Sequence, residues 1–405
     1  MNVHYDVIIV GAGLAGMFCA LQIAQKHKKN KALLVDFGRP PQKRRRFLEG
    51  AMGCLPSSDG KFYSQNLNVL ESLVGKRNIN KSNKYVSDYF VNNNISDLKV
   101  IKDKLPKKYI INKFKNLNFT VSSNDYYQLY PKDIHNLSRV VFPELENSGN
   151  IDFSFDNEVY NIKKNNNIFS LTTELGDFTC NKLLIASGRA GWMWSSDLYK
   201  EFNIVDNNDY AKIGFRIEMP ANNLKDFNES HFSAYRDDLT IDKISWYGTV
   251  IPEDHYYFTT SEFRSNEKRW HSKNVSFSLI GNILVNGNGV DEADRLAKLT
   301  FLLTNDRVNK EKVSAFMNGK SKISVIKEYN WFKPKLEELQ SAIPGLIDKS
   351  FFHVPNISPL PPKVILNKNL ETKIEGLYLA GECAGVSGLL AASVMGTIVG
   401  NDICK

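Results

Sequence analysis

The N-terminal part of the chain alternates between short apolar runs and glycine-rich or polar breaks. Residues 5–10 form an apolar run rich in β-branched side chains, residues 11–16 read GAGLAG, and residues 17–25 carry apolar side chains at helical spacing. A second apolar run, residues 32–35, ends directly before Asp36. This order predicts a strand, a tight glycine turn, a helix and a second strand, which is the start of a βαβ unit.

The middle of the chain carries weaker patterns. Residues 66–119 are rich in Asn and Lys, with helical patterns at 66–73 and 84–92, and we expect an insertion or cap there. A longer helix is expected at 133–146, with Asp133 as its N-cap. The strands expected after this helix lie at residues 151–155, 158–163, 168–173 and 177–186.

In the C-terminal half of the chain, the spacing of the apolar residues changes. Residues 211–284 alternate polar and apolar positions, which is typical of half-buried strands in an antiparallel sheet. A helical pattern at 291–303 follows, and the chain ends with a strand at 376–380 and a small-residue helix near 389–403. We therefore expect a separate, β-rich domain between two parts of the first one.

The amino-acid composition is typical of a folded, soluble protein. The chain has 405 residues, of which 42% are hydrophobic and 24% charged, close to the average for globular proteins. No stretch approaches the ~20 apolar residues of a membrane span, so no membrane partner is expected. The five cysteines lack the spacing of a metal site or a disulfide framework, and they predict reduced thiols, a cytoplasmic location and no bound metal.

The net charge of +8 arises largely from clusters at residues 26–31, 43–46 and 107–115. Such clusters have two interpretations, a solvated basic face or a surface that meets a polyanion. Charge alone leaves both open.

The glycine turn at residues 11–16 carries the first functional signal. Gly11 would make the turn, Gly13 would let the backbone approach a pyrophosphate, and Gly16 would let the helix pack on the strand. Asp36 follows Gly16 by 20 residues, where an acidic side chain meets a ribose. The pattern predicts dinucleotide binding, and it cannot distinguish NAD from FAD.

A segment near the C-terminus makes that choice. Residues 376–385, GLYLAGECAG, resemble the second FAD signature of the glutathione-reductase-like flavoproteins with two dinucleotide-binding domains. The resemblance implies that Glu382 contacts the ribityl chain or phosphate of FAD. It also implies that the helix beginning near Leu389 directs its N-terminus at the flavin pyrimidine ring, where it would stabilise negative charge.

Three further segments narrow the resemblance. Residues 58–61 (SDGK), 184–192 (LIASGRAGW) and 213–220 (IGFRIEMP) are similar to a family of FAD-dependent dehydrogenases related to aminoacetone-oxidase-like and tRNA-modifying flavoproteins. Those relatives carry several cysteines before SDGK and a Cys-Pro-Gly segment, whereas this chain has only Cys54 in the first place. Their thiol or metal chemistry is therefore not carried over.

The predicted fold class is α/β, with a Rossmann-like FAD-binding domain and a second, β-rich (α+β) substrate domain. The expected FAD domain is composite, from residues 1–65, 120–205 and 350–405, with the insertion at 66–119 and the substrate domain at 206–349. The residues expected to contact FAD are Gly11, Gly13, Leu14, Ala15, Gly16, Asp36, Phe37, Arg45, Ser58, Asp59, Gly60, Val159, Ser187, Gly188, Gly381, Glu382, Gly388, Leu389 and Leu390.

Three side chains are candidates for catalysis. Lys61 lies in the loop that passes close to the flavin in relatives, and Arg189 follows the Ser187-Gly188 turn at the carboxyl end of a strand. His353 is the candidate general acid or base by its place before the return to the FAD domain. For each, a structural role is the alternative, and Cys383 is expected to be a packing residue.

These features predict an FAD-dependent oxidoreductase that transfers a hydride between an unidentified substrate and flavin N5. One alternative is a flavoprotein that modifies a base of tRNA, rRNA or DNA, and another is a non-catalytic FAD-binding sensor. The substrate would be a small molecule or a nucleobase. The chain has no second glycine motif between a strand and a helix, so no dedicated NAD(P)H domain is expected. The electrons could come from transiently bound NAD(P)H, from the substrate or from a partner protein.

Overall fold

The first half of the molecule is built around a largely parallel sheet. The computed structural model describes residues 3–44, 48–206, 210–252, 259–262, 268–285, 287–305, 308–358 and 363–405. The strand order is β7-β2-β1-β10-β9-β8, with β21 paired to β10. The bounds are β1 Val3–Val10, β2 Ala32–Val35, β7 Ile151–Ser154, β8 Val159–Asn165, β9 Ile168–Thr173, β10 Gly176–Ile185 and β21 Leu377–Leu379. Strands β7, β2, β1, β10 and β21 are parallel, so their carboxyl ends meet at one edge.

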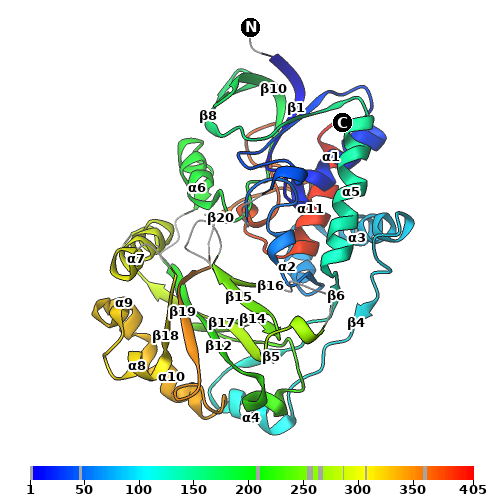
Figure 1. Cartoon of the computed structure of the whole chain (residues 1–405). Coiled ribbons are helices and arrows are strands. Elements are labelled where there is room, and N and C mark those ends of the chain that lie inside the picture. The colour runs from blue at the N-terminus through cyan, green and yellow to red at the C-terminus, as the bar shows by residue number, and fades with distance from the viewer. Residues whose placement is uncertain are drawn as a thin grey trace.

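Two helices from opposite ends of the chain pack against each other beside this sheet, α1 (Leu14–Lys26) and α11 (Leu389–Asp402) (Figure 1). Gly396 and Gly400 of α11 permit the close approach. A Cβ built on Gly396 would lie 2.0 Å from the carbonyl oxygen of Ala15, and one on Gly400 would lie 2.7 Å from that of Cys19. The helix pair therefore joins the two ends of the sequence in one core.

Further helices complete the first half. They are α2 (Asn66–Val74), α3 (Lys76–Asn92), α5 (Pro131–Asn147) and α6 (Trp192–Glu201). Apolar side chains of α2 and α3 belong to the same core as β1 and α1. Beside them lies a small sheet of β3 (Lys61–Tyr63), β6 (Tyr126–Gln128) and β4 (Val100–Ile101). Most of the expected insertion thus contributes to the first core.

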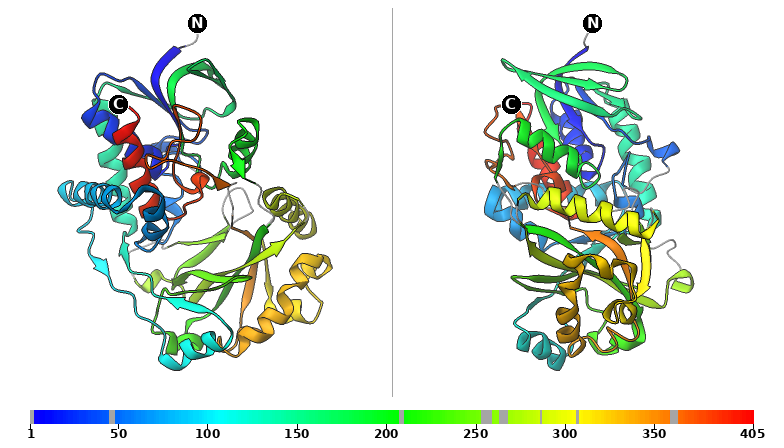
Figure 2. Two further views of the ribbon diagram at one scale, coloured as in Figure 1. Left: turned by 180° about the vertical axis from the view of Figure 1, so that it is seen from behind. Right: turned by 90° about the vertical axis from the view of Figure 1, so that its left-hand side faces the viewer.

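The second half contains an antiparallel sheet, which lies in the lower part of both views in Figure 2. Its strand order is β18-β19-β12-β17-β14-β13-β5. The bounds are β5 Thr120–Ser122, β12 Tyr210–Pro220, β13 Ser233–Arg236, β14 Leu239–Trp246, β17 Asn274–Leu284, β18 Asn309–Lys312 and β19 Phe351–Ile357. The remaining elements are α4 (Lys108–Asn116), α7 (Gly289–Thr304), α8 (Val313–Met317), α9 (Lys327–Asn330), α10 (Phe332–Gln340), β11 (Val205–Asp206), β15 (Thr249–Pro252), β16 (Thr259–Glu262) and β20 (Lys363–Val364).

The two faces of the second sheet differ in chemistry but both are buried. Along β12, Ile213, Phe215 and Ile217 enter a second apolar core that α7 and α10 help to form. The alternate side chains, Arg216 and Glu218, are 2% and 7% exposed. Ser276, Ser278, His353 and Asn356 are polar and buried on neighbouring strands. Burying so much polarity requires internal partners for each group.

The α/β fold with a second, β-rich part is confirmed. The expected strands and the helices at 133–146, 291–303 and 389–403 are present with small shifts at their ends. One detail is wrong: Asp133 is not the N-cap of α5 but its third residue, and its carboxylate accepts the N–H of Tyr130 at 2.9 Å. The domain boundaries stay a prediction, although β5 and β19, assigned to the FAD part, pair within the second sheet.

No helix in the described ranges combines the length and the apolar character that crossing a bilayer requires.

Candidate functional site

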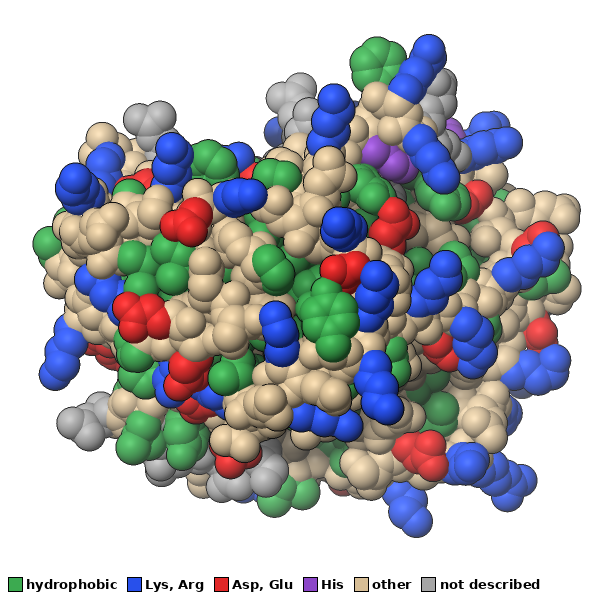
Figure 3. Space-filling model, turned by 90° about the horizontal axis from the view of Figure 1, so that it is seen from below, with side chains coloured by type: hydrophobic (Ala, Val, Ile, Leu, Met, Phe, Trp, Pro, Cys, Tyr) green, Lys and Arg blue, Asp and Glu red, His purple; other side chains and the backbone are tan. Residues whose placement is uncertain are grey.

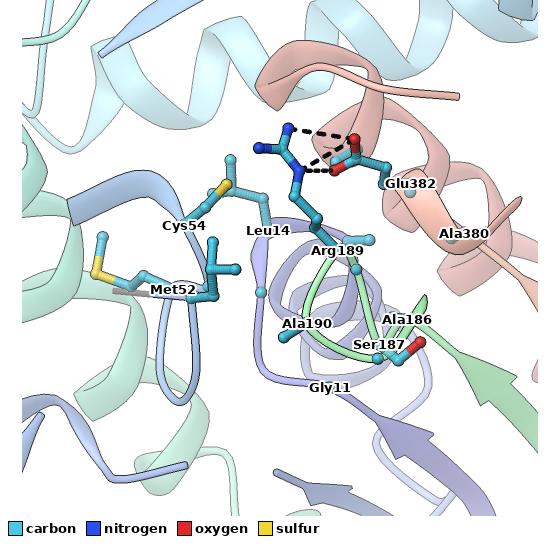
Figure 4. A pocket seen from close by; sticks show the side chains of 18 of the residues that line it. Gly11, Leu14, Met52, Cys54, Ala186, Ser187, Arg189, Ala190, Ala380 and Glu382 are labelled. Atoms are coloured by element: carbon cyan, nitrogen blue, oxygen red, sulfur yellow. Dashed lines mark hydrogen bonds and ion pairs between the residues drawn. The ribbon is translucent and has the colours of Figure 1, made fainter. Parts of the chain in front are cut away.

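A cavity of about 360 Å³ lies at the carboxyl edge of the first sheet. Three turns border it: Gly11–Gly13 after β1, Ala186–Gly188 after β10, and Ala380–Glu382 after β21. Ligands of open α/β sheets bind at this edge because the strands end there and the following helices begin there. Figure 4 shows these turns around the cavity, with Met52 and Cys54 on a loop that faces Leu14.

The glycines of the first turn have separate roles. Gly11 has φ +111°, and a Cβ there would lie 2.3 Å from the carbonyl oxygen of Ala186. A Cβ on Gly16 would lie 1.9 Å from the carbonyl oxygen of Gly11, so Gly16 serves the packing of α1 on β1. A Cβ on Gly13 would meet only the Cα of Gly53, at 3.7 Å. Gly13 therefore leaves room that the protein itself does not fill.

Two helices begin at the cavity without a side chain to satisfy their first N–H groups. The N-caps of α1 and α11 are Gly13 and Gly388, neither of which provides a capping side chain, and neither helix has an acidic residue in its first turn. Gly13, Leu14, Gly388 and Leu389 all line the cavity. Unsatisfied N–H groups and the positive end of a helix dipole bind anionic groups such as phosphate.

Asp36 ties three segments of backbone together at one end of the cavity. One carboxylate oxygen accepts the N–H of Ala12 at 2.7 Å, and the other accepts those of Gly38 and Gly50 at 2.8 and 2.9 Å. Burial raises the pKa of this carboxyl, and the three N–H donors and Arg44 oppose that rise. A carboxylate has about four lone-pair sites, so acceptor capacity remains for a ribose hydroxyl.

The basic loop at 43–46 is partly engaged in holding the fold. Arg44 donates hydrogen bonds to the carbonyl oxygens of Ala51 and Gly53, two residues of the loop that borders the cavity. Arg45, expected to contact FAD, and Arg46 lie outside the described residues. Arg44 thus stabilises the loop that forms part of the cavity wall.

Arg189 and Glu382 form an ion pair above the cavity, as the dashed lines in Figure 4 show. Nε of Arg189 lies 3.3 and 3.2 Å from the two carboxylate oxygens, and Nη2 lies 3.2 Å from Oε1. Burial acts to raise the pKa of Glu382, but the positive charges of Arg189 and Lys243 outweigh burial and lower it. Glu382 is therefore a carboxylate at neutral pH, held where the two turns meet.

Lys61 lies in the cavity wall next to Asp59. Its ammonium is 2.7 Å from a carboxylate oxygen of Asp59 and 5.8 Å from the ring centre of Tyr126. Burial acts to raise the pKa of Asp59, but Lys61, followed by His231 and Arg216, lowers it. The SDGK loop therefore lies close to the buried polar face of the second sheet and connects the two halves electrostatically.

His353 is not among the residues that line the cavity. It lies on β19, where its Nε2 is 3.0 Å from a carboxylate oxygen of Glu218. That carboxylate also accepts hydrogen bonds from Lys310 at 2.6 Å and Asn274 at 2.8 Å. Burial lowers the pKa of His353, so the neutral ring donates to Glu218. His353 thus lies in the second sheet and not beside the cavity. This position does not support the acid–base role that the sequence suggested for His353.

The other expected residues separate into two groups. Those that line the cavity are Gly11, Gly13, Leu14, Ala15, Asp36, Phe37, Ser58, Val159, Ser187, Gly188, Gly381, Glu382, Gly388 and Leu389, together with Lys61 and Arg189. Four lie behind this surface: Gly16, Asp59, Gly60 and Leu390. Leu390 is 1% exposed within the first core, and a Cβ on Gly60 would lie 1.9 Å from the carbonyl oxygen of Leu129.

Sequence reasoning did not name Met52 or Lys243, which line the cavity from a loop and from the second sheet. Trp194 of α6, one of several aromatic residues that could cover a planar substrate, also lines it. Cys383 behaves as a packing residue, because its thiol is 1% exposed and lies 3.2 Å from the carbonyl oxygen of Ala380. Within the described ranges, no group of three His, Cys, Asp or Glu side chains is placed to hold a metal ion.

Comparison with protein families gives two matches. Residues 6–44 match the model described as FAD binding domain, and residues 334–404 match the model described as Glucose inhibited division protein A. A search of curated protein sequences gave no match.

The solved structures that match this chain include three proteins, each with low sequence identity and a TM-score below 0.5. Glycine oxidase from Geobacillus kaustophilus is 13% identical, with 100% of this chain and 95% of that chain covered and a TM-score of 0.45. L-proline dehydrogenase from P. horikoshii is 11% identical, with 100% and 93% covered and a TM-score of 0.42. A flavoprotein/dehydrogenase from Cytophaga hutchinsonii is 12% identical, with 99% and 78% covered and a TM-score of 0.43.

The FAD-binding match covers β1, the glycine turn, α1, β2 and Asp36. The residues present fit that cofactor, because Gly13 leaves open space, two helix N-termini face one cavity, and Asp36 keeps acceptor capacity beside them. FAD is the cofactor of this protein, and the cavity at the carboxyl edge is where the residues gather that can hold it.

Proposed function

We propose that this FAD-dependent oxidoreductase transfers a hydride between flavin N5 and a small-molecule substrate that binds between the FAD site and the second sheet. The bound FAD supplies the hydride acceptor. The observation that carries the proposal is the shared cavity, because residues from both ends of the chain and Lys243 of the second sheet line the same space.

Different residues of the chain would bind different parts of FAD. The N–H groups at the start of α1 would hold the pyrophosphate, and Asp36 would accept a ribose hydroxyl. Glu382, kept ionised by Arg189, would accept hydrogen bonds from the ribityl end. The N-terminus of α11 would face the flavin ring and stabilise negative charge there.

On the substrate side, the SDGK loop and the second sheet would enclose the reacting groups. Lys61 is 4% exposed and fixed by Asp59, which suits a residue that positions a substrate or flavin atom. Water is kept from the buried polar face behind it, because Arg216, Ser276 and Ser278 are at most 2% exposed.

The test begins with the purified protein. It should be yellow, and heat or acid should release FAD in a ratio near one per chain. Anaerobic mixing with NADH, NADPH and a panel of amines, amino acids and hydroxy acids should then bleach the flavin spectrum with at least one of them. A protein without FAD would refute the proposal, and FAD that no donor reduces would favour the non-catalytic sensor.

A second candidate function is the modification of a nucleic-acid base. It is favoured by the match of residues 334–404 to Glucose inhibited division protein A, since the glycine pattern within that segment resembles that of tRNA uridine-modifying flavoproteins. The charge distribution gives it less support. On the face in Figure 3, Lys and Arg side chains are spread out with Asp and Glu among them, and Lys107 is paired with Asp226 at 2.6 Å.

Salt dependence separates the two candidates. A base-modifying enzyme must contact several phosphates, so its binding to a tRNA pool should weaken steeply between about 50 and 200 mM salt. A Lys43→Gln, Lys113→Gln, Lys115→Gln variant would flatten that dependence while FAD stays bound. Absence of salt-sensitive binding by the unaltered protein would leave the small-molecule reaction as the function.

A further inference from the structure

Lys243 is the point at which the second sheet reaches the FAD cavity. It belongs to β14, and among the described residues that line the cavity it is the one contributed by residues 210–357. All the others come from the first half and its loops.

The backbone at Lys243 is strained in a way that directs the side chain. Its φ is +52°, in the left-handed region that side chains other than Gly, Asn and Asp seldom adopt. The register of β14 against β17 shifts between Asp242 and Ser245, which marks a bulge at this residue. Bulges beside functional sites turn a side chain that would otherwise follow the alternation of the strand.

The ammonium of Lys243 differs from the other cations of the cavity in its contacts with the described residues. Lys61 is paired with Asp59, and Arg189 with Glu382. Lys243 forms no hydrogen bond or ion pair with any residue in the described ranges, although its charge acts on Glu382 and on Lys212. A strained, partly buried lysine that feels the charge of Glu382 but forms no ion pair with the described residues is costly unless a ligand supplies a closer negative charge.

We propose that Lys243 binds an anionic group of the substrate, a carboxylate or a phosphate, and holds the substrate against the flavin. This inference rests on the proposed function. The pyrophosphate of FAD already has the N–H groups of α1 and the open space at Gly13 in the first half of the molecule. Lys243 lines the cavity from the second sheet, which is the side that the proposed function assigns to the substrate.

The experiment uses the FAD-loaded protein and simple anions. Acetate and inorganic phosphate are titrated separately while the flavin absorbance is recorded, which measures binding without turnover. We expect at least one of them to perturb the spectrum, and Lys243→Gln to raise its Kd about tenfold or more, as expected for a lost charge-assisted hydrogen bond. Lys243→Arg should retain most of the affinity. The anion that responds identifies carboxylate or phosphate as the recognised group.

A matched control distinguishes direct contact between Lys243 and the anion from the electrostatic effect of any nearby positive charge. Lys212 lies on the same sheet, and its pKa is lowered by burial and by the charge of Lys243, but it does not line the cavity. Lys212→Gln should leave the anion Kd within about twofold. Equal losses in the two variants, or no response of the unaltered FAD-loaded protein to either anion, would overturn the inference.

The FAD content of each sample keeps this test apart from that of the function. If Lys243→Gln releases FAD while Lys212→Gln does not, Lys243 belongs to the cofactor site and the inference is wrong. If the unaltered protein itself carries no FAD, the proposed function fails first.

Discussion

The two sheets of this protein present different chemical groups at their surfaces. The first sheet presents backbone: its parallel, apolar strands end in glycine turns, and two uncapped helices offer N–H groups at that edge. The second sheet presents side chains: its antiparallel strands alternate, and one face buries Arg216, Glu218 and several hydroxyl and amide groups. In the proposed function, backbone geometry would therefore recognise the cofactor, and a network of buried charges would lie on the substrate side.

The difference determines what each half tolerates. A glycine that touches another backbone cannot accept even one methyl group, because the neighbouring carbonyl cannot move away. A buried charge can be exchanged only together with its partners, because a lone buried charge remains unsolvated. Substitutions in the first half should therefore act through sterics, and those in the second half through electrostatics and pH.

The largest expected effect is at Gly16. Gly16→Ala would place a Cβ 1.9 Å from the carbonyl oxygen of Gly11 and 3.2 Å from Ile9, so α1 must move off β1. We expect a loss of more than about 4 kcal/mol in the free energy of unfolding, measured by chemical denaturation, or no folded protein at all.

The matched variant is Gly13→Ala, three residues away in the same turn. Its φ of −71° is ordinary for alanine, and its Cβ would meet nothing nearer than 3.7 Å. This variant should fold like the unaltered protein but lose FAD, since the methyl group occupies the space of the pyrophosphate. Equal behaviour of the two variants would contradict the separate roles assigned to these glycines.

The second prediction concerns the buried network of the second sheet. Burial raises the pKa of Glu218, but hydrogen bonds from His353, Lys310 and Asn274 dominate and lower it from 4.5 to about 2. A depressed carboxyl pKa stabilises the fold above its unfolded pKa, and that contribution is lost as the pH falls from about 5 towards 2. Glu218→Gln should therefore cost about 3 kcal/mol at pH 7 and much less at pH 3.

Glu292 provides the comparison for Glu218. It pairs with Arg295 at 2.6 Å on the surface of α7, where solvent screens the pair. Glu292→Gln should change the free energy of unfolding by less than about 1 kcal/mol, with little dependence on pH. A pH profile shared by both variants would show that the buried network adds nothing of its own.

The third prediction tests the junction between the two ends of the chain. Glu382→Ala should weaken FAD binding by about 2 kcal/mol, the scale of a hydrogen bond to a charged group, as measured by titrating apoprotein with FAD. Arg189→Ala should weaken it less, because Arg189 acts by holding Glu382. If the double variant loses the sum of both effects, the two residues act independently and the ion pair has no part in binding.

The sequence predicts the first half well because its signals are local. Apolar runs next to glycine or acidic residues indicate the positions of β1, β2, β10 and α11. The turns that follow the three strands line the cavity. Short helices of mixed composition escape such reasoning. Residues 108–116, KYIINKFKN, form α4 only because Ile110 and Phe114 pack into the second core.

The second half shows what local patterns cannot supply. His353 looked like a candidate for acid–base chemistry, but the partner that defines it, Glu218, lies 135 residues away in sequence. Likewise, nothing in the alternation around Lys243 marks the bulge, since a register shift depends on how β14 pairs with β17. The roles of His353 and Lys243 depend on contacts between strands that are far apart in sequence. These roles can therefore be recognised only in the folded protein.

The smallest expected effect is a gain in stability at Lys243. Asparagine adopts a left-handed backbone at lower cost than lysine, so Lys243→Asn should relieve strain at φ +52°. We expect the free energy of unfolding of the FAD-free protein to rise by roughly 0.5–1 kcal/mol. Lys212→Asn, on β12 with an ordinary strand backbone, should instead lower it, because asparagine disfavours strands. Stability that rises while anion binding falls indicates a residue retained for its ligand. A Lys243→Asn variant less stable than the unaltered protein would mean that the lysine itself holds the bulge.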